Sequence, residues 1–115
     1  GTFDPVHHGH LRVAWEASEQ LDCELRLLPS ATPPHRDAPA ADAVHRVAML
    51  RLALAGQSQL GLELAEIERG GRSYMVDTLT DLRLAVGPER PLILVLGADA
   101  FAGLSSWHRW TGIFG

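Results

Sequence analysis

The sequence predicts an α/β fold in which helices flank a parallel sheet, and three observations support this prediction. Segments whose apolar residues recur at helical spacing alternate with short strand-like segments along the chain. Residues 92–96 are apolar without alternation, which is typical of a strand buried on both faces of a parallel sheet. With 115 residues, 46% of them hydrophobic and 21% charged, the chain suits a single globular domain over residues 1–115.

The first half of the chain predicts two helices and the first strand. A helix is expected over residues 10–21, because apolar and small residues recur there at helical spacing: Leu11, Ala14, Trp15, Ser18 and Leu21. A short strand follows at 24–28 and ends at Pro29. Residues 29–41 hold four of the seven prolines and are expected to form a loop. The second helix runs from Asp42, a candidate N-cap, to residue 55, and Gly56 ends it.

The second half continues the alternation. Leucines at every second position predict a strand over 60–65, followed by a turn over 69–72. A third helix is expected over 75–86, ended by Gly87 and Pro88. After the strand at 92–96, the chain turns into short helices that carry Trp107 and Trp110. The helical arginines are expected to be surface charges: Arg46, Arg51 and Arg83.

Composition excludes several classes of protein. A net charge of −4 argues against a nucleic-acid or membrane-surface protein as a bulk property. No apolar run approaches the roughly 20 residues that a membrane span needs. The single cysteine, Cys23, cannot form an internal disulfide, which suits a reducing compartment. We therefore expect a cytoplasmic protein without nucleic-acid or membrane partners, and the oligomeric state is left open.

The first ten residues, G-T-F-D-P-V-H-H-G-H, hold three of the six histidines. His7 and His10 flank Gly9 where a loop becomes a helix, so that imidazoles and free first-turn N–H groups can face one volume, as a phosphate site requires. Gly9 would allow close approach, His8 would be a spacer, and a polyphosphate would bias the imidazoles toward the charged form. A metal cluster and a merely structural loop are the alternatives.

This stretch closely resembles the G-x-F-D-P-x-H-x-G-H loop of the nucleotidylyltransferase superfamily. Three later segments are similar to motifs of bacterial nicotinate-nucleotide adenylyltransferases: P-P-H-R at 33–36, S-Y-M-V-D-T-L at 73–79, and G-A-D-A-F at 97–101 followed by W-H-R-W at 107–110. The resemblance covers essentially the whole chain. It implies a Rossmann-like, nucleotidylyltransferase-type sheet and the joining of nicotinate mononucleotide and ATP to give deamido-NAD and pyrophosphate.

The resemblance also implies a role for each site residue. His7 and His10 would be catalytic through contact with the ATP phosphates. The other ATP-binding residues would be Thr2, Phe3, Gly9, Gly97 and Asp99. The nicotinate nucleotide would be bound by His35, Arg36, Met75, Trp107 and His108. Mg²⁺ would enter with ATP, without a dedicated protein site.

Plainer structural roles remain open for several of these residues. Asp99 could cap a helix, Arg36 could be a solvated charge, and Trp107 and Trp110 could both be core residues on one helix. Met75 stands where the family usually has Thr, and His108 stands where an aromatic such as Tyr is common. The family also has a strand before the loop and a closing S-x-T-x-I-R segment, so the chain is expected to be a fragment.

Three alternative functions follow. The chain could belong to an adenylyltransferase that acts on phosphopantetheine, or to one that acts on the amidated mononucleotide. It could also be a nucleotide-binding domain that has lost turnover. Trp107 and the segment 73–79 speak against phosphopantetheine, and the intact His7 and His10 speak against lost turnover.

Overall fold

The computed structural model describes residues 2–3, 5–31, 42–71 and 73–114, which belong to two compact units, 1–73 and 74–115. An α/β fold with a parallel sheet is confirmed. The single domain over the whole chain stays a prediction. Among the described residues, none of the helices is long and apolar enough to cross a membrane.

The first unit contains two strands and three helices: α1 (His8–Leu21), β1 (Leu25–Leu27), α2 (Ala43–Leu54), β2 (Leu60–Leu62) and α3 (Ala65–Arg69). The strands are parallel, with Leu25 opposite Leu60 and Leu27 opposite Leu62. Both strands are shorter than the sequence predicts. The strand expected over 60–65 ends at Leu62, because the chain then turns into α3, which the sequence analysis did not predict.

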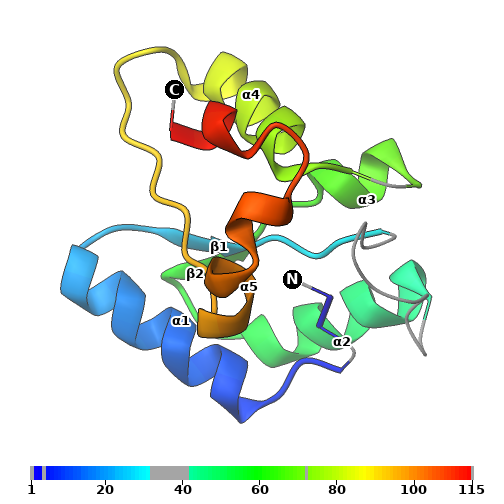
Figure 1. Ribbon diagram of the computed structural model, residues 1–115. Coiled ribbons are helices and arrows are strands. Elements are labelled where there is room, and N and C mark those ends of the chain that lie inside the picture. The colour runs from blue at the N-terminus through cyan, green and yellow to red at the C-terminus, as the bar shows by residue number, and fades with distance from the viewer. Residues whose placement is uncertain (1, 4, 32–41, 72, 115) are drawn as a thin grey trace. The chain divides into compact units, whose positions relative to one another are not determined.

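The core of this unit lies between the sheet and the helices α1 and α2, which occupy the same side of the strands (Figure 1). Ala14, Leu27, Leu50 and Leu60 are buried at its centre. The strand leucines therefore face the helices, as period-two alternation requires. Leu50 has no exposed surface, and its truncation to Ala would cost about 2–5 kcal/mol of stability.

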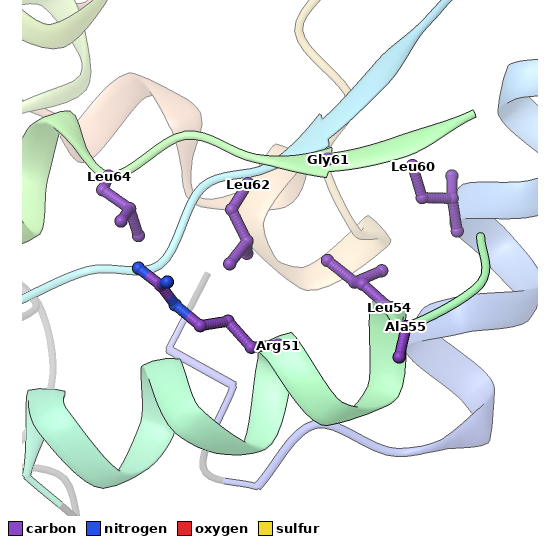
Figure 2. Close-up of a pocket in the computed structure, with 7 residues that line it drawn as sticks. All are labelled: Arg51, Leu54, Ala55, Leu60, Gly61, Leu62 and Leu64. Carbon is purple, nitrogen blue, oxygen red and sulfur yellow. The ribbon is translucent and has the colours of Figure 1, made fainter. Parts of the chain in front are cut away.

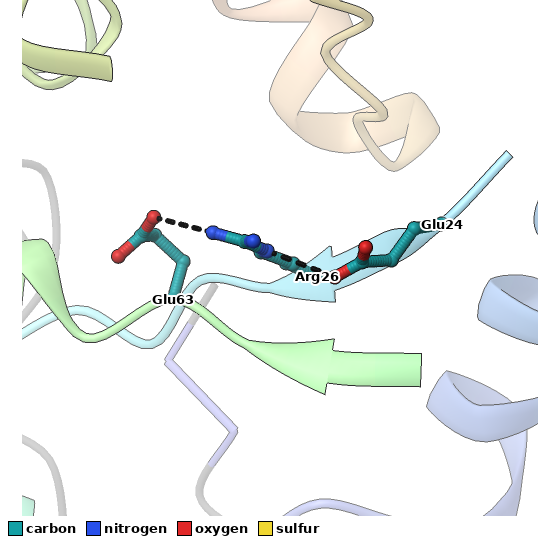
Figure 3. Close-up of polar contacts among 3 residues, drawn as sticks. All are labelled: Glu24, Arg26 and Glu63. Carbon is teal, nitrogen blue, oxygen red and sulfur yellow. Dashed lines mark hydrogen bonds and ion pairs between the residues drawn. The ribbon is translucent and has the colours of Figure 1, made fainter. Parts of the chain in front are cut away.

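Charged side chains line the opposite face of the strands. The Arg26 guanidinium lies between two carboxylates, with Nε 3.1 Å from Glu24 Oε1 and Nη1 3.4 Å from Glu63 Oε1 (Figure 3). Half-exposed pairs of this kind contribute about 0–1 kcal/mol. The trio thus marks the polar face of the sheet and adds little to stability.

The helix ends follow the local signals in the sequence. The Asp42 carboxylate accepts a hydrogen bond from the His45 N–H at 3.0 Å, which confirms Asp42 as the N-cap of α2 and lowers the pKa of this carboxyl. Gly56 follows the end of α2 with a φ of +81°, a conformation that glycine adopts without strain. In α1 the expected apolar face is only partly right, because Ala14 and Ser18 are buried whereas Trp15 and Leu21 are exposed.

The second unit is helical in its described part. It contains α4 (Met75–Val86), α5 (Ala98–Ala102) and two short 3-10 helices, η1 (Leu104–Ser106) and η2 (Trp110–Phe114). Gly87 ends α4 with a φ of +91°, as predicted. The helix η2 packs on α4, and a Cβ on Gly112 would lie only 2.8 Å from Val76 Cγ2.

The prediction of a doubly buried strand at 92–96 is wrong for this structure. These residues form no regular element, and Leu92, Ile93 and Val95 are exposed. A strand exists only through backbone hydrogen bonds to a neighbouring strand. The described residues of the unit 74–115 contain no strand to which residues 92–96 could bond.

Candidate functional site: an imidazole pair at a helix start

Two histidines cap the first helix. His7 is the N-cap of α1, in extended conformation, and its Nδ1 accepts a hydrogen bond from the Gly9 N–H at 3.1 Å. In return, His10 Nδ1 accepts from the His7 backbone N–H, also at 3.1 Å. This is a capping box in which imidazoles replace the usual hydroxyl and carboxylate groups. The loop-to-helix transition expected near residue 10 therefore begins at His7.

The cap brings the two imidazoles into one cluster. The rings of His7 and His10 stack with centroids 3.8 Å apart, and the Phe3 ring meets His10 edge-on at 5.0 Å. Because both Nδ1 atoms accept hydrogen bonds, each neutral ring carries its proton on Nε2. The fold thus fixes the tautomer of both rings and gives the cluster two Nε2–H donors.

Within the fold, His10 favours the neutral form. Partial burial and the neighbouring His7 lower the pKa of His10 below its usual value. Protonation of Nδ1 would also remove the acceptor that the His7 N–H needs. A polyphosphate placed beside the ring would act in the opposite direction and raise the pKa.

Gly9 has a structural reason to be glycine that the sequence analysis did not foresee. A Cβ at this position would lie 2.9 Å from His7 Cε1 and 3.0 Å from His7 Nδ1. With a Cβ here, the His7 ring would have to shift from its present place. Glycine therefore leaves room for the imidazole cluster itself, in addition to any approach of a ligand.

The loop before the cluster is held by a buried arginine. Arg46 of α2 is 1% exposed and donates from Nη1 to the Thr2 carbonyl at 2.9 Å. The expectation that Arg46 is a surface charge is therefore wrong. The same expectation is only partly right for Arg83, which donates to the carbonyls of Gly87 and Arg90, whereas Arg51 is exposed.

In the second unit, an aromatic pair stands at the start of α4. Tyr74 is the N-cap, makes no side-chain capping hydrogen bond, and is followed by Met75 as the first helical residue. The Tyr74 and His108 rings lie 4.5 Å apart and tilted by 39°. Trp107 is half-buried at the end of η1, so it does not share a helix with Trp110, which begins η2.

The predicted site residues lie in the first unit, in the second unit, or outside the described residues. Gly97 precedes α5, with open space around the position of a Cβ, and Asp99 lies inside α5. His35 and Arg36 lie outside the described residues. The first unit contains the predicted site residues Thr2, Phe3, His7, Gly9 and His10. The second unit contains Met75, Gly97, Asp99, Trp107 and His108.

The whole chain, residues 1–115, matches the cytidylyltransferase-like family model. The chain belongs to the cytidylyltransferase-like family. The match includes both the imidazole cluster and the aromatic pair, and it agrees with the resemblance carried by the first ten residues.

Curated relatives of this family member share about half of its residues. It is similar to the "probable nicotinate-nucleotide adenylyltransferase" of Marinobacter nauticus, with 48% identity over 100% of this chain and 54% of the relative. The relative of that name from Hahella chejuensis is 52% identical over 98% of this chain and 52% of its own length. The one from Methylococcus capsulatus is 53% identical over 99% of this chain and 55% of its own length. The chain thus spans about half the length of the curated relatives it matches.

The cytidylyltransferase-like chain shows no metal cage in its described part: no group of three or more His, Cys, Asp or Glu side chains is placed to hold a metal ion. A groove of about 410 Å³ opens between α2 and β2, where Leu60, Leu62 and Leu64 point toward Arg51 and Leu54 (Figure 2). Its lining contains none of the predicted site residues. The groove is therefore not the site that the motifs predict.

Sequence reasoning missed several buried polar side chains, among them Arg46 and Ser73. Arg46 lies four residues before the buried Leu50, on the same helical stripe, and this spacing was the available signal. The Ser73 hydroxyl is buried and has no hydrogen-bond partner among the described residues. Ser73 opens the S-Y-M-V-D-T-L segment, and nothing in that pattern indicates that its hydroxyl is buried.

Proposed function

We propose that the complete protein transfers the adenylyl group of ATP to nicotinate mononucleotide, giving deamido-NAD and pyrophosphate in NAD biosynthesis. The relatives' printed name, nicotinate-nucleotide adenylyltransferase, supports this substrate pair. The observation that carries the proposal is the His7–His10 cluster, because its hydrogen bonds leave two Nε2–H donors at the positive end of the 14-residue helix α1.

Transfer needs no covalent enzyme intermediate. A phosphate oxygen of nicotinate mononucleotide attacks the α-phosphorus of ATP in line, the new P–O bond forms, and the bond to the β-phosphate oxygen breaks to release pyrophosphate. Negative charge grows on the phosphate oxygens, so fixed N–H donors lower the barrier. His7 and His10 supply these donors, and Thr2, Phe3 and Gly9 lie along the same phosphates. Two further residues, Gly97 and Asp99, are assigned to the adenosine.

The nicotinate nucleotide is assigned to residues around the start of α4 and the end of η1, together with His35 and Arg36. Trp107 stacks on the pyridine ring, and backbone groups near Met75 and His108 read its carboxylate. The missing side-chain cap at Tyr74 supports this assignment, because a carboxylate can take the place of a capping oxygen at a helix start. His35 and Arg36 complete the nucleotide site.

Mg²⁺ is proposed as the metal that accompanies ATP. Mg²⁺ prefers phosphate oxygens and water to many protein ligands, so the ATP phosphates themselves could hold it without a dedicated protein site. When bound, Mg²⁺ neutralises charge on the phosphates. We propose that the protein is cytoplasmic and has no nucleic-acid or membrane partner, because its single cysteine suits a reducing compartment and its net charge is −4.

Pyrophosphate release by the full-length protein tests the proposal. ATP is supplied with nicotinate mononucleotide, with its amide or with phosphopantetheine in parallel reactions. Nicotinate mononucleotide is expected to give the highest kcat/KM. Equal or better turnover with phosphopantetheine would reject the substrate assignment, and no turnover with any acceptor would favour a nucleotide-binding domain.

A further inference from the structure

Arg46 connects three segments of the first unit through its guanidinium. Nη1 donates to the carbonyl oxygens of Thr2 at 2.9 Å and Ser30 at 2.6 Å, and Nη2 donates to the carbonyl of Ala31 at 3.0 Å. The side chain is 1% exposed, so these bonds form away from water. One planar group thus ties α2 to the start of the phosphate loop and to the segment after β1.

The Thr2 carbonyl stands next to an unusual backbone conformation. Phe3 has a φ of +52°, in the left-handed region that residues with a side chain seldom adopt. Such a conformation persists only where its surroundings hold it. The hydrogen bond from Arg46 fixes the peptide group on the N-terminal side of Phe3, and the Phe3 ring in turn packs edge-on against His10 at 5.0 Å.

We propose that Arg46 is a positioning residue for the His10 imidazole. The guanidinium fixes the Thr2 carbonyl by a hydrogen bond. The fixed peptide group stabilises the left-handed conformation of Phe3, and the Phe3 ring then keeps His10 beside His7. The inference rests on the proposed function for its effect on catalysis, whereas its effect on the His10 ring is independent of any activity.

Lysine at this position would keep the charge and lose the geometry. A guanidinium presents several N–H donors in a fixed plane, which suits three carbonyl oxygens at once, whereas an ammonium is a compact charge on a flexible stem. Arg46→Lys therefore tests the positioning role without leaving an apolar hole. Arg51→Lys is the matched control, because Arg51 lies on the same helix and is exposed.

The experiment compares wild type, R46K and R51K in the full-length protein. Nitrogen NMR shifts of the substrate-free proteins report the His10 tautomer, and steady-state kinetics with ATP and nicotinate mononucleotide report kcat and KM. For R46K we expect a mixed His10 tautomer and a kcat lowered about tenfold or more, because small displacements of a catalytic group are costly. R51K is expected to match wild type in both measurements.

Two outcomes would overturn the inference. If R46K only lowers the Tm and keeps the wild-type His10 signals and kcat, Arg46 is merely structural. If R46K does not fold, Phe3→Leu decides instead, because it removes the ring contact and leaves Arg46 in place: unchanged His10 signals in F3L would reject the relay. Should the wild type show no adenylyl transfer, the proposed function fails, while the NMR comparison still tests the positioning of His10.

Discussion

The starts of α1 and α4 differ in how side chains cap the backbone N–H groups of the first turn. Each is the first turn of a long helix and each carries predicted site residues. At α1 the N-cap and N3 side chains, His7 and His10, exchange hydrogen bonds with the backbone, whereas at α4 the N-cap Tyr74 makes no side-chain capping bond and packs its ring on His108. At the start of α1, backbone N–H groups hydrogen-bond to the two imidazoles and orient them. At the start of α4, the side chain of the cap residue accepts no hydrogen bond from the backbone N–H groups.

This difference suits the two ligands proposed. Phosphates that gain charge during transfer need donors fixed beforehand, and the α1 cap supplies two imidazoles of fixed tautomer. The ring carboxylate of the proposed substrate keeps its charge throughout the reaction, so its binding would not require donors fixed in this way. Substitutions at α1 should therefore lower kcat, and substitutions at α4 should mainly raise KM.

Among substitutions that keep both histidines, the largest effect at the two helix starts is expected from a methyl group at the start of α1. In Gly9→Ala the new Cβ would lie 2.9 Å from His7 Cε1, so we expect the ring to shift and its capping hydrogen bond to weaken. We expect kcat to fall about tenfold or more and stability to fall by about 1 kcal/mol, the usual cost of a lost cap. Steady-state kinetics and thermal unfolding measure both quantities.

Gly97→Ala is the matched control for stability, because nothing lies within 4 Å of a Cβ there. Its free energy of unfolding should stay within about 0.5 kcal/mol of wild type. A Gly9→Ala protein as stable and as active as wild type would show that the cap does not position His7.

A smaller effect is expected from Tyr74→Leu at the α4 start. Loss of the ring contact with His108 should raise the KM for nicotinate mononucleotide about two- to tenfold and leave kcat within about twofold. Leu84→Ala is the control, since Leu84 is on the same helix and is exposed. A fall in kcat with an unchanged KM would contradict the division of roles.

The smallest effect is a pH dependence of stability that comes from the α1 start. The fold lowers the pKa of His10, so the unfolded chain binds more protons at this group, and the contribution of His10 to stability falls as the pH drops through 6.5 toward the lowered value. His10→Asn, which keeps an acceptor but does not titrate, should have a flatter profile over this range. Denaturant midpoints of the two proteins measure it, and identical slopes would contradict the lowered pKa.

What the sequence predicted well depends on neighbours along the chain. Asp42, Gly56 and Gly87 mark helix ends through contacts within a few residues, and their helices lie where expected. The segment 92–96 has the apolar residues of a buried strand, yet a strand depends on a partner elsewhere in the chain, and its pattern could not reveal whether one is present.

At the site, too, features that depend on nearby residues could be predicted, whereas features that depend on distant residues could not. The motif pointed to His7 and His10 as a pair, and the structure stacks them. It could not show that Gly9 makes room for His7, or that Arg46 reaches the Thr2 carbonyl, because these facts depend on three-dimensional contacts. The role of each site residue toward ATP and the nicotinate nucleotide stays a prediction.

The central claim is that His10 acts on the phosphates during transfer, and single-turnover kinetics of the full-length protein test it most directly. ATP labelled on its α-phosphate is mixed with excess enzyme and nicotinate mononucleotide, and the labelled dinucleotide is followed in wild type, His10→Ala and His8→Ala. His8 is the control, since it is an exposed imidazole next to the cluster. We predict that His10→Ala slows transfer about a hundredfold or more while His8→Ala stays near wild type. Equal transfer rates in all three proteins would contradict the account.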